Sequence, residues 1–302
     1  MAREQEVREI SGVVTAHKQR EGGGFIVRRP FPSFGLDQVD PFLLLDEMGP
    51  VQYGPHEAVG APDHPHRGFE TVTYMLEGEF EHEDSAGHRG TLRPGDVQWM
   101  TAGGGIVHSE MPSRRIREEG GKVHGFQLWV NLPARLKLAR PRYQEISAAR
   151  IPQATTADGR ARVRVIAGEA LGARAVIDTN SPIVYQDWSL EPGADVATPI
   201  AREQQALVYV FAGQAKVGDA GQPVAEGQMA ILGSGVAVRL RVDPASAVPA
   251  RLLLLGGVPL AEPVARYGPF VMNTEREIRE AMVDFQSGKM GEITRTAEVG
   301  GG

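Results

Sequence analysis

Residues 64–112 read HPHRGFETVTYMLEGEFEHEDSAGHRGTLRPGDVQWMTAGGGIVHSEMP, and this stretch decides the fold class. Within it, the run 69–76 alternates between two rows of side chains, and both rows carry apolar or β-branched residues. That pattern indicates a barrel strand with one face inside and the other face covered. Similar short runs follow at 124–132 (HGFQLWVNL) and 206–217 (ALVYVFAGQAKV). Many short strands separated by glycine and proline predict an all-β sandwich or barrel.

A weak internal repeat predicts two similar barrels. A strand that ends at Gly78 and an apolar strand after Gly95 are echoed by a strand that ends at Gly213 and another after Gly227. Duplicated strand–Gly–strand units are typical of a duplicated barrel. A stretch rich in Pro, Ala, Arg and Thr separates the two halves and is a predicted linker. We therefore expect an N-terminal domain at 1–135, a linker at 136–160 and a C-terminal domain at 161–302.

One helix is predicted near the C-terminus, at residues 275–287, and we place it in the C-terminal domain. Thr274 and Glu277 have the spacing of a capping box, in which each side chain satisfies a free backbone donor of the first turn. Gly288 is a natural stop. The apolar stripe of this helix consists of Ile278, Met282 and Phe285. Because the stripe covers one face only, we expect the helix to pack on a barrel in a structural role.

All eight histidines lie in the first 124 residues, and two pairs of potential metal ligands stand two residues apart. His64 and His66 form the first pair, and His108 and Glu110 form the second. Residues i and i+2 of a strand point to the same face, so two strands of one barrel could direct four ligand atoms at one interior point. Three neutral imidazoles and one carboxylate suit a borderline divalent transition metal. The sequence therefore predicts a single metal site.

The other candidate residues receive different interpretations. Glu70 has the strand parity of the first histidine pair, so it is either a further ligand or an ion-pair partner of Arg67 or of a neighbouring strand. His56 lies near the first pair in sequence and is a candidate neighbour of the ligands. We expect solvated side chains at His17, His82 and His88. We expect His124 to be a hydrogen-bonded strand histidine rather than a ligand.

Composition excludes several function classes. A net charge of −6 and a pI near 5.8 argue against direct binding to nucleic acid or to anionic membranes. The lack of cysteine excludes disulfides, thiolate ligands and a cysteine nucleophile. The charged start MAREQEVREI lacks the apolar core of a signal peptide, and no apolar run has the length of a membrane span. We therefore expect a cytoplasmic protein.

At this point the motifs resemble a known family. The paired motifs resemble those of cupins, and their details resemble the pirin family. The segments that carry the resemblance are 40–50 (DPFLLLDEMGP), 64–112, 124–133 (HGFQLWVNLP) and 268–282 (GPFVMNTEREIREAM). The resemblance spans nearly the whole chain and is most specific in the first half. It implies a bicupin: two stacked antiparallel β-barrels, each a double-stranded β-helix, with a short C-terminal helix and a metal in the N-terminal barrel.

The resemblance also implies a ligand set. The family pattern of three His and one Glu maps onto His64, His66, His108 and Glu110, and it leaves Glu70 as a neighbour of the ligands. We expect one divalent transition metal, Fe(II) in the first place, with Ni, Cu, Mn, Co or Zn as the other candidates. The C-terminal barrel has no histidine, and the repeat places Pro199 and Ala201 opposite His64 and His66. We therefore expect that barrel to lack a metal.

Two functions follow from the resemblance. Several bacterial pirins resemble quercetin 2,3-dioxygenases, which implies a metal-dependent dioxygenase that cleaves a flavonol such as quercetin with O2 and releases CO. Glu110 would then be the general base that accepts the proton of the flavonol hydroxyl. Eukaryotic relatives act as nuclear transcriptional coregulators, which implies the alternative of an iron-dependent redox sensor that acts through protein partners. We expect a monomer that does not bind nucleic acid directly.

Overall fold

The structure is a computed structural model that describes residues 6–294, and strands dominate it. Between residues 6 and 294 there are only two α-helices, α1 (Arg114–Glu119) and α2 (Glu275–Gln286). Short 3-10 turns occur at η1 (Ala134–Leu136) and η2 (Ala148–Arg150). The expected all-β class is therefore confirmed. Neither α-helix of this part of the chain has the length and apolar character that a membrane crossing requires.

The chain divides into two compact units, which we describe separately. The first unit comprises residues 20–27, 48–145 and 262–294, and the second unit comprises residues 6–19, 28–47 and 146–261. Both units are discontinuous in sequence, whereas the domains expected at 1–135 and 161–302 are continuous. Helix α2, which we expected in the C-terminal domain, lies in the first unit. The expectation that residues 1–135 and residues 161–302 form separate domains stays a prediction.

The first unit contains a four-stranded sheet in the order β5-β10-β7-β8. Its strands are β5 (Ala61–His66), β7 (Phe80–Asp84), β8 (Arg89–Leu92) and β10 (Ile106–Pro112). The short hairpin β25 (Ala265–Tyr267) and β26 (Phe270–Met272) also belongs to this unit. Strand β10 lies between β5 and β7 and pairs antiparallel with both of them.

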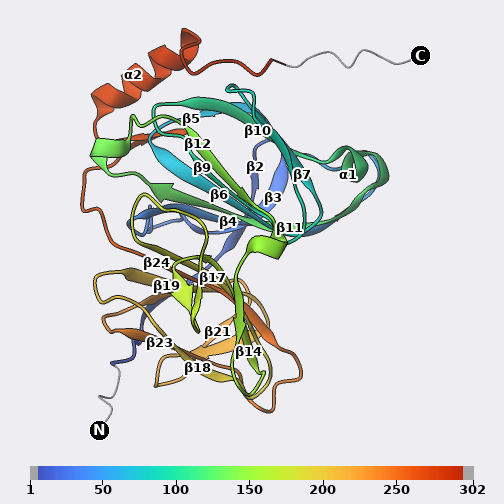
Figure 1. The fold of residues 1–302 in the computed structure, drawn as a ribbon, viewed down its shortest axis with the longest axis vertical. Coiled ribbons are helices and arrows are strands. Elements are labelled where there is room, and N and C mark those ends of the chain that lie inside the picture. The colour runs from blue at the N-terminus through green and yellow to red at the C-terminus, as the bar shows by residue number, and fades with distance from the viewer. Residues whose placement is uncertain (1–5, 295–302) are drawn as a thin grey trace. The chain divides into compact units, whose positions relative to one another are not determined.

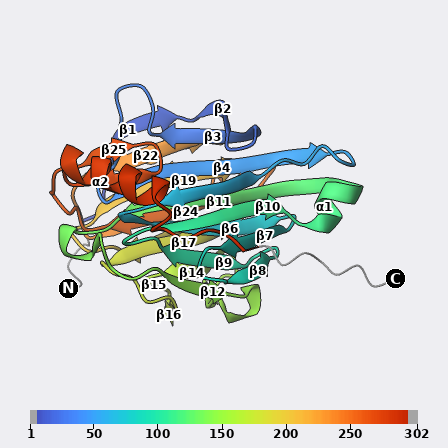
Figure 2. The same cartoon turned by 90° about the horizontal axis from the view of Figure 1, so that it is seen from above.

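A seven-stranded sheet has the order β12-β9-β6-β11-β4-β3-β2. Its strands are β2 (His17–Glu21), β3 (Phe25–Phe31), β4 (Phe42–Tyr53), β6 (Phe69–Glu77), β9 (Val97–Thr101), β11 (Gly121–Asn131) and β12 (Arg142–Ile146). In Figure 2, β6, β9 and β11 run alongside one another, and β6 pairs antiparallel with both of the others. Residues 69–75 of β6 are all buried, as the two apolar rows in its sequence predict.

The second unit repeats this arrangement. A seven-stranded sheet has the order β1-β22-β19-β24-β17-β14-β13, and a four-stranded sheet has the order β18-β23-β20-β21. The strands are β1 (Ile10–Thr15), β13 (Gln153–Thr155), β14 (Ala161–Ala167), β17 (Ile183–Leu190), β18 (Asp195–Pro199), β19 (Gln205–Ala212), β20 (Gln214–Val217), β21 (Gln222–Ala225), β22 (Gln228–Leu232), β23 (Ala237–Arg241) and β24 (Ala250–Gly257), with a small hairpin β15 (Glu169–Ala170) and β16 (Ala173–Arg174). Gly78 and Gly213 follow β6 and β19 with φ of 83° and 69°, so the repeat seen in the sequence marks equivalent turns.

Apolar side chains fill the interior of the second unit. In its four-stranded sheet, β18 and β23 have the places that β5 and β10 have in the first unit. The inward side chains of this strand pair include Val196, Val238 and Leu240, all within one buried cluster. Trp188 lies in the same cluster, and its indole N–H donates to the Gln186 side chain. The interior face of the strand pair β18–β23 is therefore ordinary hydrophobic core.

Helix α2 begins and ends close to the predicted residues. The Thr274 hydroxyl accepts from the backbone N–H of Glu277, and the Glu277 carboxylate accepts from the backbone N–H of Thr274, so the capping box is formed. Ile278 of the predicted stripe is buried, whereas Phe285 remains 40% exposed. Met282 is partly buried and packs against the same cluster as Ile278, so the stripe packs through Ile278 and Met282 and is more exposed at Phe285.

Candidate metal centre

Three histidines meet where strand β5 pairs with strand β10. Figure 1 labels these two strands. His108 lies directly opposite His64 in the antiparallel register, and His66 lies opposite Ile106. Directly opposite residues share a face of the sheet, and so do residues two apart on one strand. The potential ligand atoms of His64, His66 and His108 accordingly all lie within 4.8 Å of one another. The structure thus brings together the three imidazoles in a group that could bind a metal ion.

Hydrogen bonding sets the orientation of the His64 ring. Its Nδ1 lies 2.7 Å from the carbonyl oxygen of Pro62, so Nδ1 carries the proton and donates it to that oxygen. The lone pair of His64 Nε2 then points toward His66 Nε2, 3.1 Å away. Two nitrogen ligands about 2.1 Å from one cation and at right angles to each other are separated by about 3 Å. The two imidazoles therefore already have the spacing of neighbouring ligands.

Burial keeps the other two imidazoles neutral. The pKa values of His66 and His108 lie well below 6.5, first because both rings are buried and second because His64 is close. Both ring nitrogens of His108 and Nδ1 of His66 are buried without a hydrogen-bond partner. Buried polar atoms without a partner are rare in folded proteins and call for an explanation such as an ion. Neutral imidazoles with unused lone pairs fit a divalent transition metal.

Glu110 stands on β10, two residues after His108, but its carboxylate is held by other groups. Its Oε1 accepts from the Thr73 hydroxyl and its Oε2 accepts from the Gln127 amide, both at 2.7 Å. The carboxylate is not part of the group of atoms within 4.8 Å, and the pairing of β10 with β5 shifts register between His108 and Glu110. Glu110 as the fourth ligand therefore stays a prediction.

Glu70 has a different set of contacts from those expected. It is 1% exposed, and its Oε1 accepts a 2.7 Å hydrogen bond from the Thr101 hydroxyl on the neighbouring strand β9. The guanidinium of Arg67 binds Asp284 and the carbonyl of Gly104. The role of Glu70 as a neighbour of the ligands stays a prediction.

The prediction that His82 is solvated is wrong. His82 is only 2% exposed, its Nε2 lies 2.7 Å from Glu145 Oε1, and its ring stacks on Tyr143. Its burial follows from pairing, because β7 runs beside β10 and places His82 directly opposite Glu110. His56 is exposed, and its place beside the ligands stays a prediction. The expectations for the other histidines hold. His17 and His88 are exposed, and His124 is buried on β11.

Sequence reasoning also missed Asp84 and Tyr143. Asp84 lies directly opposite His108 on β7, so Asp84 and His82 continue the face of the three histidines. Burial raises the pKa of Tyr143, and the negative charges of Asp84 and Glu110 raise it further. The hydrogen bond from His82 lowers the pKa of Glu145. His82 and Asp84 have the same i, i+2 spacing as the predicted ligand pairs. Because the sequence around them is rich in charged residues, it favoured solvent exposure instead.

Aromatic rings form one wall beside the histidines. The ring centroids of Phe69 and Trp129 lie 5.0 and 5.1 Å from that of His66, and 4.3 Å from each other. The guanidinium of Arg266 lies over the Trp129 ring at 5.1 Å. Both rings are buried, so this wall surrounds His66 with apolar, aromatic side chains.

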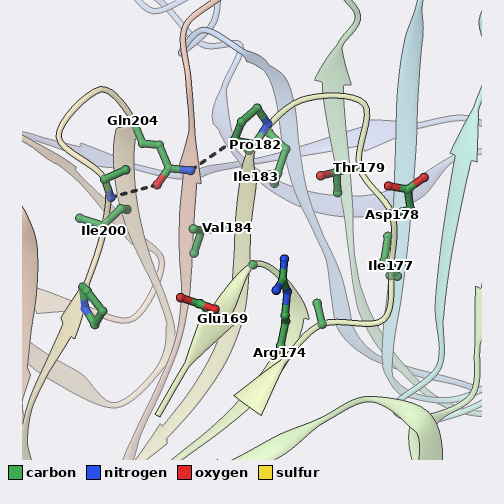
Figure 3. A pocket seen from close by; sticks show the side chains of 14 residues that line it. Glu169, Arg174, Ile177, Asp178, Thr179, Pro182, Ile183, Val184, Ile200 and Gln204 are labelled. Carbon is green, nitrogen blue, oxygen red and sulfur yellow. Dashed lines mark hydrogen bonds between the residues drawn. The ribbon is translucent and has the colours of Figure 1, made fainter. Parts of the chain in front are cut away.

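The second unit contains a pocket of about 610 Å³, and none of the described residues that line it is a histidine (Figure 3). The Gln204 amide closes one side, since it donates to the Pro182 carbonyl and accepts from the Ala201 backbone N–H. Glu169 and Arg174 project toward the pocket from the β15–β16 hairpin. Pro199 and Ala201, the positions expected opposite His64 and His66, line this pocket and offer no side-chain ligand. The pocket therefore does not reproduce the histidine site.

Duplicated antiparallel β-architecture with histidines gathered on two paired strands of one copy defines a bicupin with one candidate metal centre. The family model described as Pirin matches residues 24–130, and the model of the Pirin C-terminal cupin domain matches residues 185–291. The chain belongs to the pirin family.

Its relatives cover nearly the full length of the chain. A pirin-like protein of Solanum lycopersicum is 46% identical over 279 residues, which are 92% of this chain and 91% of the relative. Human pirin is 43% identical over 288 residues, 94% of each chain. A crystal structure of quercetin 2,3-dioxygenase from Acinetobacter baumannii matches with a TM-score of 0.88 and 40% identity, covering 95% of this chain and all of that one.

Proposed function

We propose that this protein is a metal-dependent, ring-cleaving dioxygenase that takes a flavonol such as quercetin together with O2 and releases CO. The observation that carries the proposal is the convergence of three histidines on one point of the β5–β10 pair. The 40% identity to the Acinetobacter baumannii quercetin 2,3-dioxygenase supports the choice of reaction. The aromatic wall beside His66 supports the choice of a planar aromatic substrate.

His64, His66 and His108 would hold the metal, for which Fe(II) is our first candidate. When bound, the metal would supply the acidity that ionises a flavonol hydroxyl and the redox chemistry with O2. The contribution of the chain is to keep the ligands neutral and oriented. Burial keeps His66 and His108 unprotonated, and the Pro62 carbonyl fixes the His64 ring. Such contacts between a ligand and a backbone oxygen set the ring orientation in metal sites.

Glu110 is the residue that we propose as the proton acceptor for the flavonol 3-hydroxyl. The Thr73 hydroxyl and the Gln127 amide hold one carboxylate oxygen each, so its plane is fixed on the same strand as His108. Each oxygen retains a free lone pair, which is what acceptance of a proton requires. Phe69 and Trp129 would contact the flavonol rings and exclude water from the reacting carbons.

The test compares Glu110→Gln with His66→Ala in anaerobically prepared, Fe(II)-loaded protein. Glu110→Gln should retain metal, because three imidazoles remain, but lose about 10²–10⁴-fold in quercetin-dependent oxygen uptake, because an amide does not accept the proton. His66→Ala should lose metal and activity together. The exposed His17→Ala variant is the matched control and should behave like the parent.

Metal content per chain and steady-state oxygen uptake are measured on the same samples. Parent-like turnover by Glu110→Gln would show that Glu110 is not the base. A metal-loaded parent that consumes no oxygen with any flavonol would rule out the dioxygenase and favour the redox-sensor alternative.

A further inference from the structure

The C-terminal arm, which we define as residues 262–291, packs around the strands that carry the histidines. It contains the β25–β26 hairpin and helix α2, drawn in orange and red in Figure 1. Its buried apolar side chains form one cluster with Val107 of β10, and the members from the arm are Ala265, Phe270, Met272, Ile278, Ala281 and Met290. Val107 directly precedes His108, so the arm covers the strand of a candidate ligand.

The arm is hydrogen-bonded to the segment that directly follows His66. The backbone N–H of Arg67 donates to the carbonyl of Pro269, and the backbone N–H of Val271 donates to the carbonyl of Arg67, at 3.3 and 3.0 Å. Gly68 has φ of +91°, and a Cβ there would lie 1.9 Å from the Val271 carbonyl oxygen. The two segments approach so closely that only glycine fits between them.

The side chain of Arg67 extends this connection to helix α2. Its Nε donates to the Gly104 carbonyl at 2.7 Å, and its Nη1 binds Asp284 of α2 at 3.0 Å. Gly104 belongs to the glycine-rich bend that leads into β10. One guanidinium therefore ties together the turn after β5, the bend before β10 and the arm.

Lys137 forms a second tie at the same place. Its ammonium is 1% exposed and donates three hydrogen bonds, to the carbonyls of Gly68 and Val271 and to the Asn131 side chain, at 2.9, 3.0 and 2.7 Å. An ammonium has three donors, so every one of them is used. Lys137 thus joins the turn after β5, the end of β11 and the arm.

A third tie reaches the strand of His108. The Ser85 hydroxyl donates to the carbonyl of Met290 in the arm, at 2.8 Å, and accepts from the backbone N–H of Val107, at 3.2 Å. Val107 directly precedes His108 in the chain. The Ser85 hydroxyl therefore links the end of the arm to the strand that carries His108.

We infer that the C-terminal arm is a clamp that holds the His66 and His108 strands at ligand spacing, and that Lys137, Arg67 and Ser85 are positioning residues of the metal centre. This inference rests on the proposed metal site but not on the flavonol reaction. Residues that orient ligands without touching the metal typically contribute 10–100-fold to metal affinity. None of the three residues would touch the metal, so their effect would be transmitted through the two backbone segments that they join.

The experiment measures metal binding rather than turnover. Lys137→Met removes three donors from the clamp, and Lys122→Met is its matched control, because Lys122 lies in the same unit but binds Glu77 at the surface. Asp284→Ala removes the contact of Arg67 with α2 together with an exposed ion pair to Lys289, and it provides a milder variant if Lys137→Met does not fold. Arg276→Ala, which breaks an exposed ion pair on the same helix, is the control for Asp284→Ala.

Dissociation rates of Co(II) are measured with a chelator at a temperature where each variant is fully folded, together with the visible spectrum of bound Co(II). We expect about 10–100-fold faster release from Lys137→Met, a smaller acceleration for Asp284→Ala and a changed Co(II) spectrum in both. Both controls should match the parent. If the folded clamp variants release Co(II) at the parental rate with the parental spectrum, the inference is wrong, whatever the activity with quercetin.

Discussion

Acid should destabilise the metal-free protein through two buried histidines. The pKa values of His66 and His108 in the folded protein lie well below 6.5, whereas a histidine in an unfolded chain has a pKa of about 6.5. Below pH 6.5 the unfolded chain therefore takes up a proton at each imidazole while the folded protein does not. Proton uptake by the unfolded state alone lowers the free energy of unfolding, so this contribution is lost as the pH falls.

The unfolded pKa sets an upper value for the magnitude, because a histidine that stays neutral in the folded protein contributes the full titration of the unfolded chain. Between pH 7.0 and pH 5.5, one such histidine reduces the free energy of unfolding by on the order of 1 kcal/mol. His66 and His108 together should therefore contribute at most roughly 2 kcal/mol of acid destabilisation. Neither value needs correction for solvent screening, because both rings are buried.

The assay is urea unfolding at pH 7.0 and pH 5.5 in the presence of a chelator, with the double variant His66→Gln/His108→Gln as reference. Titrating groups far from the two rings affect both proteins equally, so the difference between the two pH dependences reports on the group of histidines. We expect the parent to lose roughly 2 kcal/mol more than the double variant. Equal losses in both proteins would refute the reasoning, because the histidines would then be protonated in the folded state as readily as in the unfolded chain.

Two further outcomes test the fold. Thr274→Ala removes the hydroxyl of the α2 capping box and should lower the free energy of unfolding by about 1 kcal/mol in urea titrations, and no loss would mean that the cap is not formed in solution. Trp188→Ala should cost about 3–5 kcal/mol by the same method, because this fully buried side chain belongs to the core of the second unit. Trp188→Ala should still bind Co(II) with the parental affinity, and a weakened site would show that the second unit contributes to metal binding.

The sequence reveals the histidine group because its signal is local. His64 and His66 stand two apart on one strand, as do His108 and Glu110, and period two determines the face of a strand wherever the strand pairs. The same reasoning predicted the all-β class and the equivalent turns at Gly78 and Gly213.

Burial that depends on distant pairing was harder to predict. His82 is surrounded in sequence by Glu and Asp, which favoured solvent exposure, yet β7 pairs with β10 and turns His82 inward. The amphipathic pattern of residues 275–287 likewise predicts a packed helix without saying on which unit it packs. The helix shares a buried cluster with residues of β10, β25 and β26, and no periodicity in the sequence connects these elements.

The arm is also the last part of the described chain to leave the ribosome. His64, His66 and His108 emerge more than 150 residues before the residues at 262–291 that hold their strands in place. A nascent chain that ends before residue 262 contains every imidazole of the site but none of the arm's contacts to Arg67, Ser85 or Lys137. With the proposed clamp, tight metal capture would require residues 262–291 to have been synthesised, so chains truncated before residue 262 would carry the ligands and yet compete poorly for the cell's metal.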